Sequence, residues 1–151
     1  KILSNAGGVN PEACAKAIRE LIRELKLDLK VAVVLGDELI EKKDKFSDQK
    51  LKEMYSETDF PKIENIASIN AYLGAFPIAQ ALNDGADIVI TGRSVDSAVT
   101  LAACIYSFGW QEDDYNKLAG GSLAGHIIEC GTQSTGGNFT DWEESTKNCM
   151  K

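Results

Sequence analysis

The sequence is poor in the residues that metal sites, disulfide frameworks and nucleic-acid interfaces need. It contains a single histidine, and its four cysteines are widely spaced at Cys14, Cys104, Cys130 and Cys149. Small secreted domains carry dense cysteine frameworks instead, so we expect a reducing, intracellular compartment, either the cytoplasm or the mitochondrial matrix. The 16 Lys and Arg are outnumbered by 23 Asp and Glu, which gives a net charge of −7. Because nucleic-acid binding needs positive charge to neutralise phosphates, we expect no nucleic-acid partner.

Long hydrophobic runs are also missing. No apolar run approaches the roughly 20 residues that a helix needs to cross a bilayer, and the first residues lack a charged leader followed by an apolar stretch. We therefore expect no membrane partner. The 151 residues are 44% hydrophobic and 26% charged, which is typical of a globular protein with one core. Because the chain starts almost directly on a strand-like segment without an initiator Met, we expect it to be a fragment of a larger domain.

Apolar segments that end at glycine predict the strands of a sheet. Ile2–Ser4 precedes a glycine turn, and residues 30–36 and 86–92 are β-branched runs without polar alternation, typical of buried parallel strands. Helical patterns lie between and after these runs. The fold class that follows is α/β, with a mostly parallel, twisted, Rossmann-like sheet and helices on both faces.

The helices are predicted from capping signals and apolar spacing. Asn10, Pro11 and Glu12 indicate the start of a helix that runs to about Lys26, with its apolar stripe at Ala13, Ala17, Leu21 and Leu25. Further helices are predicted at 69–83, 95–108 and 118–130, the last rich in small residues that favour close packing. Residues 38–62 are charged and weakly periodic, so we expect a helix with an exposed excursion there.

In parallel sheets, ligands bind beyond the carboxyl ends of the strands, which identifies three candidate loops. The first contains Asn5, Gly7, Gly8 and Asn10, whose backbone N–H groups and following helix N-terminus suit an anion. A tight turn that requires glycine explains this loop equally well. In the second loop, Asp37 follows a strand and is suited either to a ribose hydroxyl or to capping a helix.

The third loop follows the last predicted strand and carries the most chemistry. Arg93 offers a planar fork for a carboxylate or phosphate, and Ser94 and Asp96 lie at the start of the next helix. The alternative is that Arg93 only pairs with Asp96 and caps that helix.

Two further groups are candidates for the chemistry itself. His126 and Glu129 share a helix face with Cys130, so His126 is suited to acid–base transfer with Glu129 orienting it. Three ligands from one turn rarely complete a zinc site, so we expect no metal there, and packing is the favoured role of Cys130. Gly136 and Gly137 end a flexible, hydroxyl-rich loop that either closes over a ligand or is only a surface loop.

Four motifs, in this order along almost the entire chain, resemble the acyclic terpene utilisation AtuA family. They are Asn5-Ala-Gly-Gly-Val-Asn-Pro11, Asn70-Ala-Tyr-Leu-Gly-Ala75, Gly85-Ala-Asp-Ile-Val-Ile-Thr-Gly-Arg93 with Asp96, and Leu123-Ala-Gly-His-Ile-Ile-Glu-Cys-Gly131 through Thr135-Gly-Gly137. The resemblance adds Asn70 to the candidate ligand-binding residues. It also implies that residues 1–151 form part of a single AtuA-like domain whose N-terminal portion, a glycine-rich strand end and an acidic segment, is absent.

The resemblance implies a role near the breakdown of branched, terpene-derived acids, which proceeds through acyl-CoA thioesters, but it implies no particular reaction and no known cofactor. We therefore expect an enzyme that binds an anionic substrate, a carboxylate or an acyl-CoA, with Arg93 and the first loop holding the anion. His126 with Glu129 or Asp96 would transfer a proton. The alternatives are a non-catalytic binding or assembly subunit, as a homo-oligomer or in a larger complex, and a Rossmann-type nucleotide domain.

Overall fold

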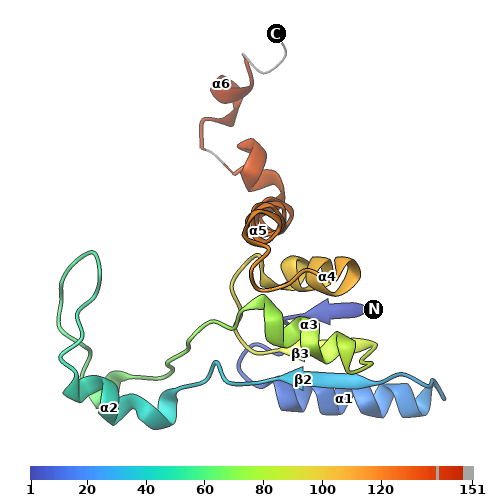
Figure 1. Ribbon diagram of the computed structural model, residues 1–151. Coiled ribbons are helices and arrows are strands. Elements are labelled where there is room, and N and C mark those ends of the chain that lie inside the picture. Colours follow the sequence, from blue (N-terminus) through green and yellow to red (C-terminus); the bar gives the residue numbers. More distant parts are fainter. Residues whose placement is uncertain (139, 148–151) are drawn as a thin grey trace.

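The computed structural model describes residues 1–138 and 140–147, which fold around a three-stranded parallel sheet (Figure 1). Its strands are β1 (Ile2–Ser4), β2 (Val31–Val34) and β3 (Ile88–Thr91), in the order β1-β3-β2. In the register of the sheet, Ile88 of β3 lies between Ile2 of β1 and Val31 of β2. The α/β fold class and the parallel sheet predicted from the sequence are thus confirmed.

Helices cover both faces of this sheet. Along the chain, β1 is followed by α1 (Pro11–Glu24), and β2 and β3 by α3 (Ala75–Asn83) and α4 (Ala98–Phe108). The helix α1 contacts β2 and β3 on one face, whereas α3 and α4 pack on the other (Figure 1). Right-handed crossovers that run in opposite directions place their helices on opposite faces, which accounts for this arrangement.

The central strand β3 is the buried centre of the fold. All four of its residues are buried, because it has a strand on each side and helices on both faces. Val89 belongs to the main core, and by alternation along the strand its neighbours Ile88 and Ile90 face α1. The core consists of small and branched residues, Val34, Ala75, Ile78, Ala79, Leu82, Ala86, Val89, Ala98, Ala102 and Ile105. In β2, predicted as a buried strand, only Val34 is fully buried, because β2 lies at an edge of the sheet.

The capping prediction for α1 is confirmed, but its predicted apolar stripe is wrong. The Asn10 side chain accepts a hydrogen bond from the N–H of Ala13 at 3.0 Å, with proline at the first helical position. The helix buries Ala15, with Cys14, Ile18 and Ile22 half-buried, while Leu21 and Leu25 are more than half exposed. The two stripes are adjacent on the helix, so apolar spacing alone did not show which one faces the sheet.

Between β2 and α3 the chain leaves the sheet and returns to it. The excursion contains a 3₁₀ turn, η1 (Ile40–Lys42), the short helix α2 (Lys43–Asp48) and a second 3₁₀ turn, η2 (Ile63–Asn65). Figure 1 shows α2 and the following loop well away from the sheet, as the charged composition predicted.

The helix predicted over residues 69–83 starts six residues later, at Ala75. The preceding segment is extended, because its backbone pairs with two loops: Asn70 bridges Glu38 and Leu73 bridges Ser94. Pro77 is the third residue of α3, where its missing N–H needs no intrahelical partner, so proline is tolerated there. Similarly, α4 starts at Ala98 instead of Val95, because the N–H of Val95 donates to the carbonyl of Leu73.

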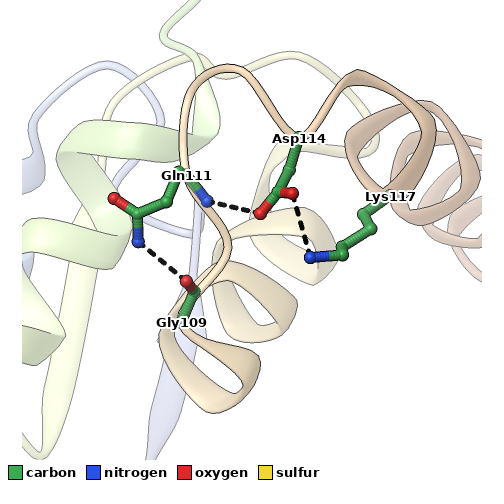
Figure 2. Close-up of polar contacts among 4 residues, drawn as sticks. All are labelled: Gly109, Gln111, Asp114 and Lys117. Carbon is green, nitrogen blue, oxygen red and sulfur yellow. Dashed lines mark hydrogen bonds and ion pairs between the residues drawn. The ribbon is translucent and has the colours of Figure 1, made fainter.

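A polar turn joins α4 to α5 (Tyr115–Cys130) (Figure 2). The Asp114 carboxylate accepts hydrogen bonds from the backbone N–H of Gln111 at 3.0 Å and from the Lys117 ammonium at 2.9 Å. These two donors, the backbone N–H first, lower the pKa of Asp114. The Gln111 side chain donates to the carbonyl of Gly109 at 2.8 Å, which ties the turn to the end of α4.

The small residues of α5 allow the close packing that the sequence predicted. A Cβ at Gly125 would lie 2.9 Å from the carbonyl oxygen of Ser97, and one at Gly121 would lie 2.7 Å from the Trp110 ring.

After α5 the chain forms η3 (Gly131–Thr135) and α6 (Trp142–Thr146), which extend away from the sheet (Figure 1). Among the described helices, none combines the length and the hydrophobicity that a membrane span requires.

Candidate functional site

The loops that follow β1 and β3 meet at the carboxyl edge of the sheet. A Cβ at Gly7 would lie 2.6 Å from the Cβ of Pro11 and 2.7 Å from the carbonyl oxygen of Thr91, so only glycine fits there. Within the loop after β1, the N–H of Gly8 donates to the carbonyl of Asn5, and the N–H of Asn10 to that of Gly7. These two donors are therefore used inside the turn, and the Asn10 side chain is used as the cap of α1.

Asp37 joins the loops that follow β2 and β3. Its residue surface is only 3% exposed. One carboxylate oxygen, Oδ2, accepts from the backbone N–H of Arg93 at 2.8 Å and from the side-chain amide of Asn70 at 3.0 Å. A buried carboxylate is stable only when hydrogen-bond donors compensate for the water that it has lost. These two bonds therefore hold the segments around Asp37, Asn70 and Arg93 together. Asp37 does not cap a helix, since the next helical turn has Leu39 at its cap position.

Gly92 is the counterpart of this buried carboxylate. A Cβ at Gly92 would overlap the side chain of Asp37. Its φ is not in the left-handed region, so glycine is required here by space and not by conformation. The glycine that ends β3 thus allows the Asp37 carboxylate to reach the N–H of the next residue.

The Arg93 side chain is held by an aromatic ring. Its guanidinium donates to the hydroxyl of Tyr72 at 2.8 Å and lies 5.1 Å from the ring centroid. The hydrogen bond to Tyr72 is the main cause that raises the pKa of Arg93, with smaller contributions from the charges of Asp37 and Asp96. Arg93 donates to Tyr72 and makes no ion pair with Asp96 among the described residues, so it is not simply a partner of the helix start.

Two cavities lie at this edge of the sheet. The first, of about 350 Å³, is lined by Gly8, Val9, Glu38, Ser68, Asn70, Tyr72 and Arg93. The second, of about 400 Å³, lies between the start of α1 and the chain after β2, residues 9–12 and 35–42. Three of the predicted binding residues, Gly8, Asn70 and Arg93, thus share the first cavity. Asn10 lines the second, while Asn5 and Gly7 shape the turn beside both.

Ser94 is buried and unpartnered. It is 6% exposed, and its hydroxyl makes no hydrogen bond with any residue that the structure describes. It lines neither of the two cavities. Its predicted role in binding remains a prediction.

The predicted catalytic residues on α5 lie outside both cavities. His126 and Glu129 are exposed, and in the described part of the chain no hydrogen bond joins them. Glu129 instead accepts from the Cys130 thiol at 3.5 Å. Burial, followed by this contact, raises the pKa of Cys130, which disfavours the nucleophilic thiolate form. Asp96 lies near enough to Cys130 to add to this effect.

The loop that carries Gly136 and Gly137 is more ordered than predicted. Residues Gly131–Thr135 form a 3₁₀ helix, and the N–H of Gly137 donates to the carbonyl of Thr132 at 2.7 Å. A Cβ at Gly137 would lie 2.8 Å from the Cβ of Thr132. These glycines therefore close a turn, and they line neither cavity.

Sequence reasoning missed Tyr72, Glu38 and Val9 as site residues. Tyr72 was assigned to a helix, so its position opposite Arg93 was not visible. Its place two residues after Asn70, inside a family-like motif, was the available signal. Val9, in the glycine turn, is 89% exposed, and valine in such a position gives no sign of function from sequence.

Within residues 1–138 and 140–147, no group of three or more His, Cys, Asp or Glu side chains is placed to hold a metal ion. The cysteines Cys14, Cys104 and Cys130 are free thiols, and Cys149 lies outside the described residues.

Comparison with protein families gives a match over the whole chain. The profile of the family described as "Acyclic terpene utilisation family protein AtuA" matches residues 1–151, the whole chain. The comparisons with curated proteins and with solved structures give no match.

Proposed function

This chain belongs to the acyclic terpene utilisation family AtuA, and on that premise we propose that the cavity around Arg93 binds the anionic group of a small molecule. The family name links the chain to acyclic terpene utilisation. Breakdown of such compounds yields carboxylic acids and their thioesters, so a small anionic group is the feature that a binding site in this process would recognise.

The placement of Arg93 carries the proposal. Arginine has five N–H donors in a planar fork that matches a carboxylate. One of them is used by Tyr72, and the structure describes no other hydrogen bond of the guanidinium, which leaves four for a ligand. The backbone of Arg93 is fixed by Asp37 and its side chain by Tyr72, so little conformational freedom would be lost on binding.

The neighbouring residues supply uncharged polar groups. Ser68 and Asn70 line the same cavity, and the Asn70 amide nitrogen is already directed to Asp37. A carboxylate on Arg93 would therefore meet one cation and neutral groups, with Glu38 as the only acid in the wall.

The test measures binding of short carboxylates by titration calorimetry, with Arg93→Ala as the variant and Arg23→Ala as the matched control. Arg23 lies in the last turn of α1, at the opposite edge of the sheet. We expect Arg93→Ala to weaken binding at least tenfold, since a charge-assisted hydrogen bond is worth about 1.5–3 kcal/mol, and Arg23→Ala to have no effect. Equal binding by the wild type and Arg93→Ala would contradict the proposal.

A Tyr72→Phe variant separates the two effects of Tyr72. It keeps the ring beneath the guanidinium and removes the hydroxyl that orients it. We expect a loss of affinity of a few fold, smaller than that of Arg93→Ala.

A second candidate function, a non-catalytic assembly subunit, is favoured by the outer face of α5. Leu123 and Ile127 are 63% and 49% exposed there, on the side of the helix opposite the glycines that contact α4. Pairing of this face with a second copy of the chain would bury these side chains. Light scattering of the wild type and of Leu123→Asn/Ile127→Asn tests it: a dimer that the substitutions dissociate supports assembly, and a monomeric wild type contradicts it.

A further inference from the structure

The two cavities at the carboxyl edge adjoin each other. Val9 and Glu38 line both of them, so the cavity around Arg93 borders the one between α1 and the chain after β2. A ligand whose anionic group lies on Arg93 would therefore extend past Val9 into the second cavity.

The wall of the second cavity is mainly acidic. It contains Glu12, Asp37, Glu38 and Glu41, with Lys42 as the one basic residue. The N-terminus of α1 faces this cavity, but the side chain of Asn10 already accepts from the N–H of Ala13. Phosphate groups carry up to two negative charges each and would be repelled by these carboxylates. The electrostatics therefore disfavour a coenzyme A moiety or a nucleotide in this cavity.

The same wall leaves apolar side chains in water. Val9, between the two cavities, is 89% exposed, and Leu35 is 52% exposed. Leu39 and Ile40 add further apolar surface to the second cavity. Covering these side chains with a hydrocarbon chain would remove apolar area from water, which is favourable in proportion to the area.

From these two observations we infer that the ligand is a free monocarboxylic acid with an apolar chain, and not its coenzyme A thioester. The carboxylate binds Arg93, and the chain passes Val9 into the second cavity beside Leu35. This inference rests on the proposed function, because it requires an anion on Arg93, and it narrows the class of ligand.

The experiment titrates the purified protein with butanoate, hexanoate and octanoate, and with octanoyl-CoA and inorganic phosphate. We expect affinity to rise by about twofold to fourfold for each added methylene, the upper value corresponding to complete burial. Octanoate should bind at least tenfold more tightly than octanoyl-CoA, and phosphate should bind most weakly.

Two variants test the inference: one tests the binding of the apolar chain and the other the exclusion of the coenzyme A thioester. Val9→Asn should flatten the chain-length series, whereas Leu27→Asn, at a half-exposed leucine near the opposite edge of the sheet, should leave the series intact. Glu12→Gln/Glu41→Gln should reduce the discrimination against octanoyl-CoA several-fold, since both acids are exposed.

The outcomes distinguish this inference from the proposed function. Carboxylate binding that depends on Arg93 but not on chain length, or tighter binding of octanoyl-CoA than of octanoate, would overturn the inference and leave the proposed function standing. Carboxylate binding that is unaffected by Arg93→Ala would overturn the proposed function itself.

Discussion

Each edge of the sheet is tied together by one aspartate, and the two aspartates differ in their exposure to water. At the amino edge, Asp87 accepts from the backbone N–H of Lys30 at 3.0 Å and from the ammonium of Lys1 at 3.0 Å, with its side chain 35% exposed. At the carboxyl edge, Asp37 is 3% exposed and accepts from Arg93 and Asn70. Both carboxylates join segments that are distant in the sequence.

The difference shows where this chain requires accurate positioning. An exposed ion pair contributes little, because water and salt screen it. A buried carboxylate bonded to neutral donors is costly to disturb, because its partners would remain without water or a substitute. The buried carboxylate, Asp37, holds the backbone of Arg93, at the edge where parallel sheets bind ligands.

The largest effect is expected from removing the buried carboxylate. Asp37→Ala leaves the Arg93 N–H and the Asn70 amide without an acceptor, so we expect a loss of about 3 kcal/mol in the free energy of unfolding. Urea denaturation measures it, and hydrogen exchange at the Arg93 amide should accelerate with it. A loss below about 1 kcal/mol would show that water replaces the carboxylate.

The next effect is expected from filling the space beside that carboxylate. Gly92→Ala places a methyl group against Asp37, and overpacking of this kind costs about 1–3 kcal/mol. In the Asp37→Ala background the same substitution should cost much less, because the clash is removed. A double-mutant cycle measures this coupling, and strictly additive effects would contradict it.

A smaller effect of opposite sign is expected at Ser94. Its hydroxyl is buried without a described partner, so Ser94→Ala removes an unsatisfied group. We expect the free energy of unfolding to stay the same or to rise by up to about 1 kcal/mol. Thermal unfolding decides the matter: destabilisation by Ser94→Ala would show that the hydroxyl has a partner such as an ordered water.

The smallest effect is expected at the exposed aspartate. The N–H of Lys30, and then Lys1, lower the pKa of Asp87. A lowered folded-state pKa contributes stability that is present above the ordinary aspartate pKa, about 3.9. That contribution is lost as pH falls through the still lower folded-state value.

Asp87→Asn should therefore be slightly less stable than the wild type at neutral pH, and the difference should disappear in acid. Denaturation between neutral and acidic pH tests this. A difference that persists at the lowest pH would mean that charge at Asp87 is not its cause.

The sequence was sufficient for the strands, because each is a short apolar run that is followed closely by glycine. It also identified Arg93 and Asn70, the first from its place after a strand and the second from a family motif. It did not show that residues 69–73 are extended. Their apolar spacing fits a helix, and only pairing with Glu38 and Ser94, far along the chain, favours the extended form.

The sequence also did not predict that Asp37 joins two loops, because its hydrogen-bond partners lie 33 and 56 residues away along the chain. The exposed stripe of α1 was misassigned for a related reason. Local patterns describe which faces are apolar, whereas tertiary packing decides which of them is covered.

The extended segment at Asn70 has a practical consequence. The N–H of Leu39 donates to the carbonyl of Ile69, and the N–H of Ala71 donates to the carbonyl of Asp37. These two backbone hydrogen bonds hold together the two ends of the excursion, residues 39–69. The free energy of closing a loop changes only slowly with its length. The tip around Met54 and Tyr55 should therefore tolerate shortening, or the insertion of a tag or fluorescent reporter. The cavity around Arg93 should keep its geometry after such a change.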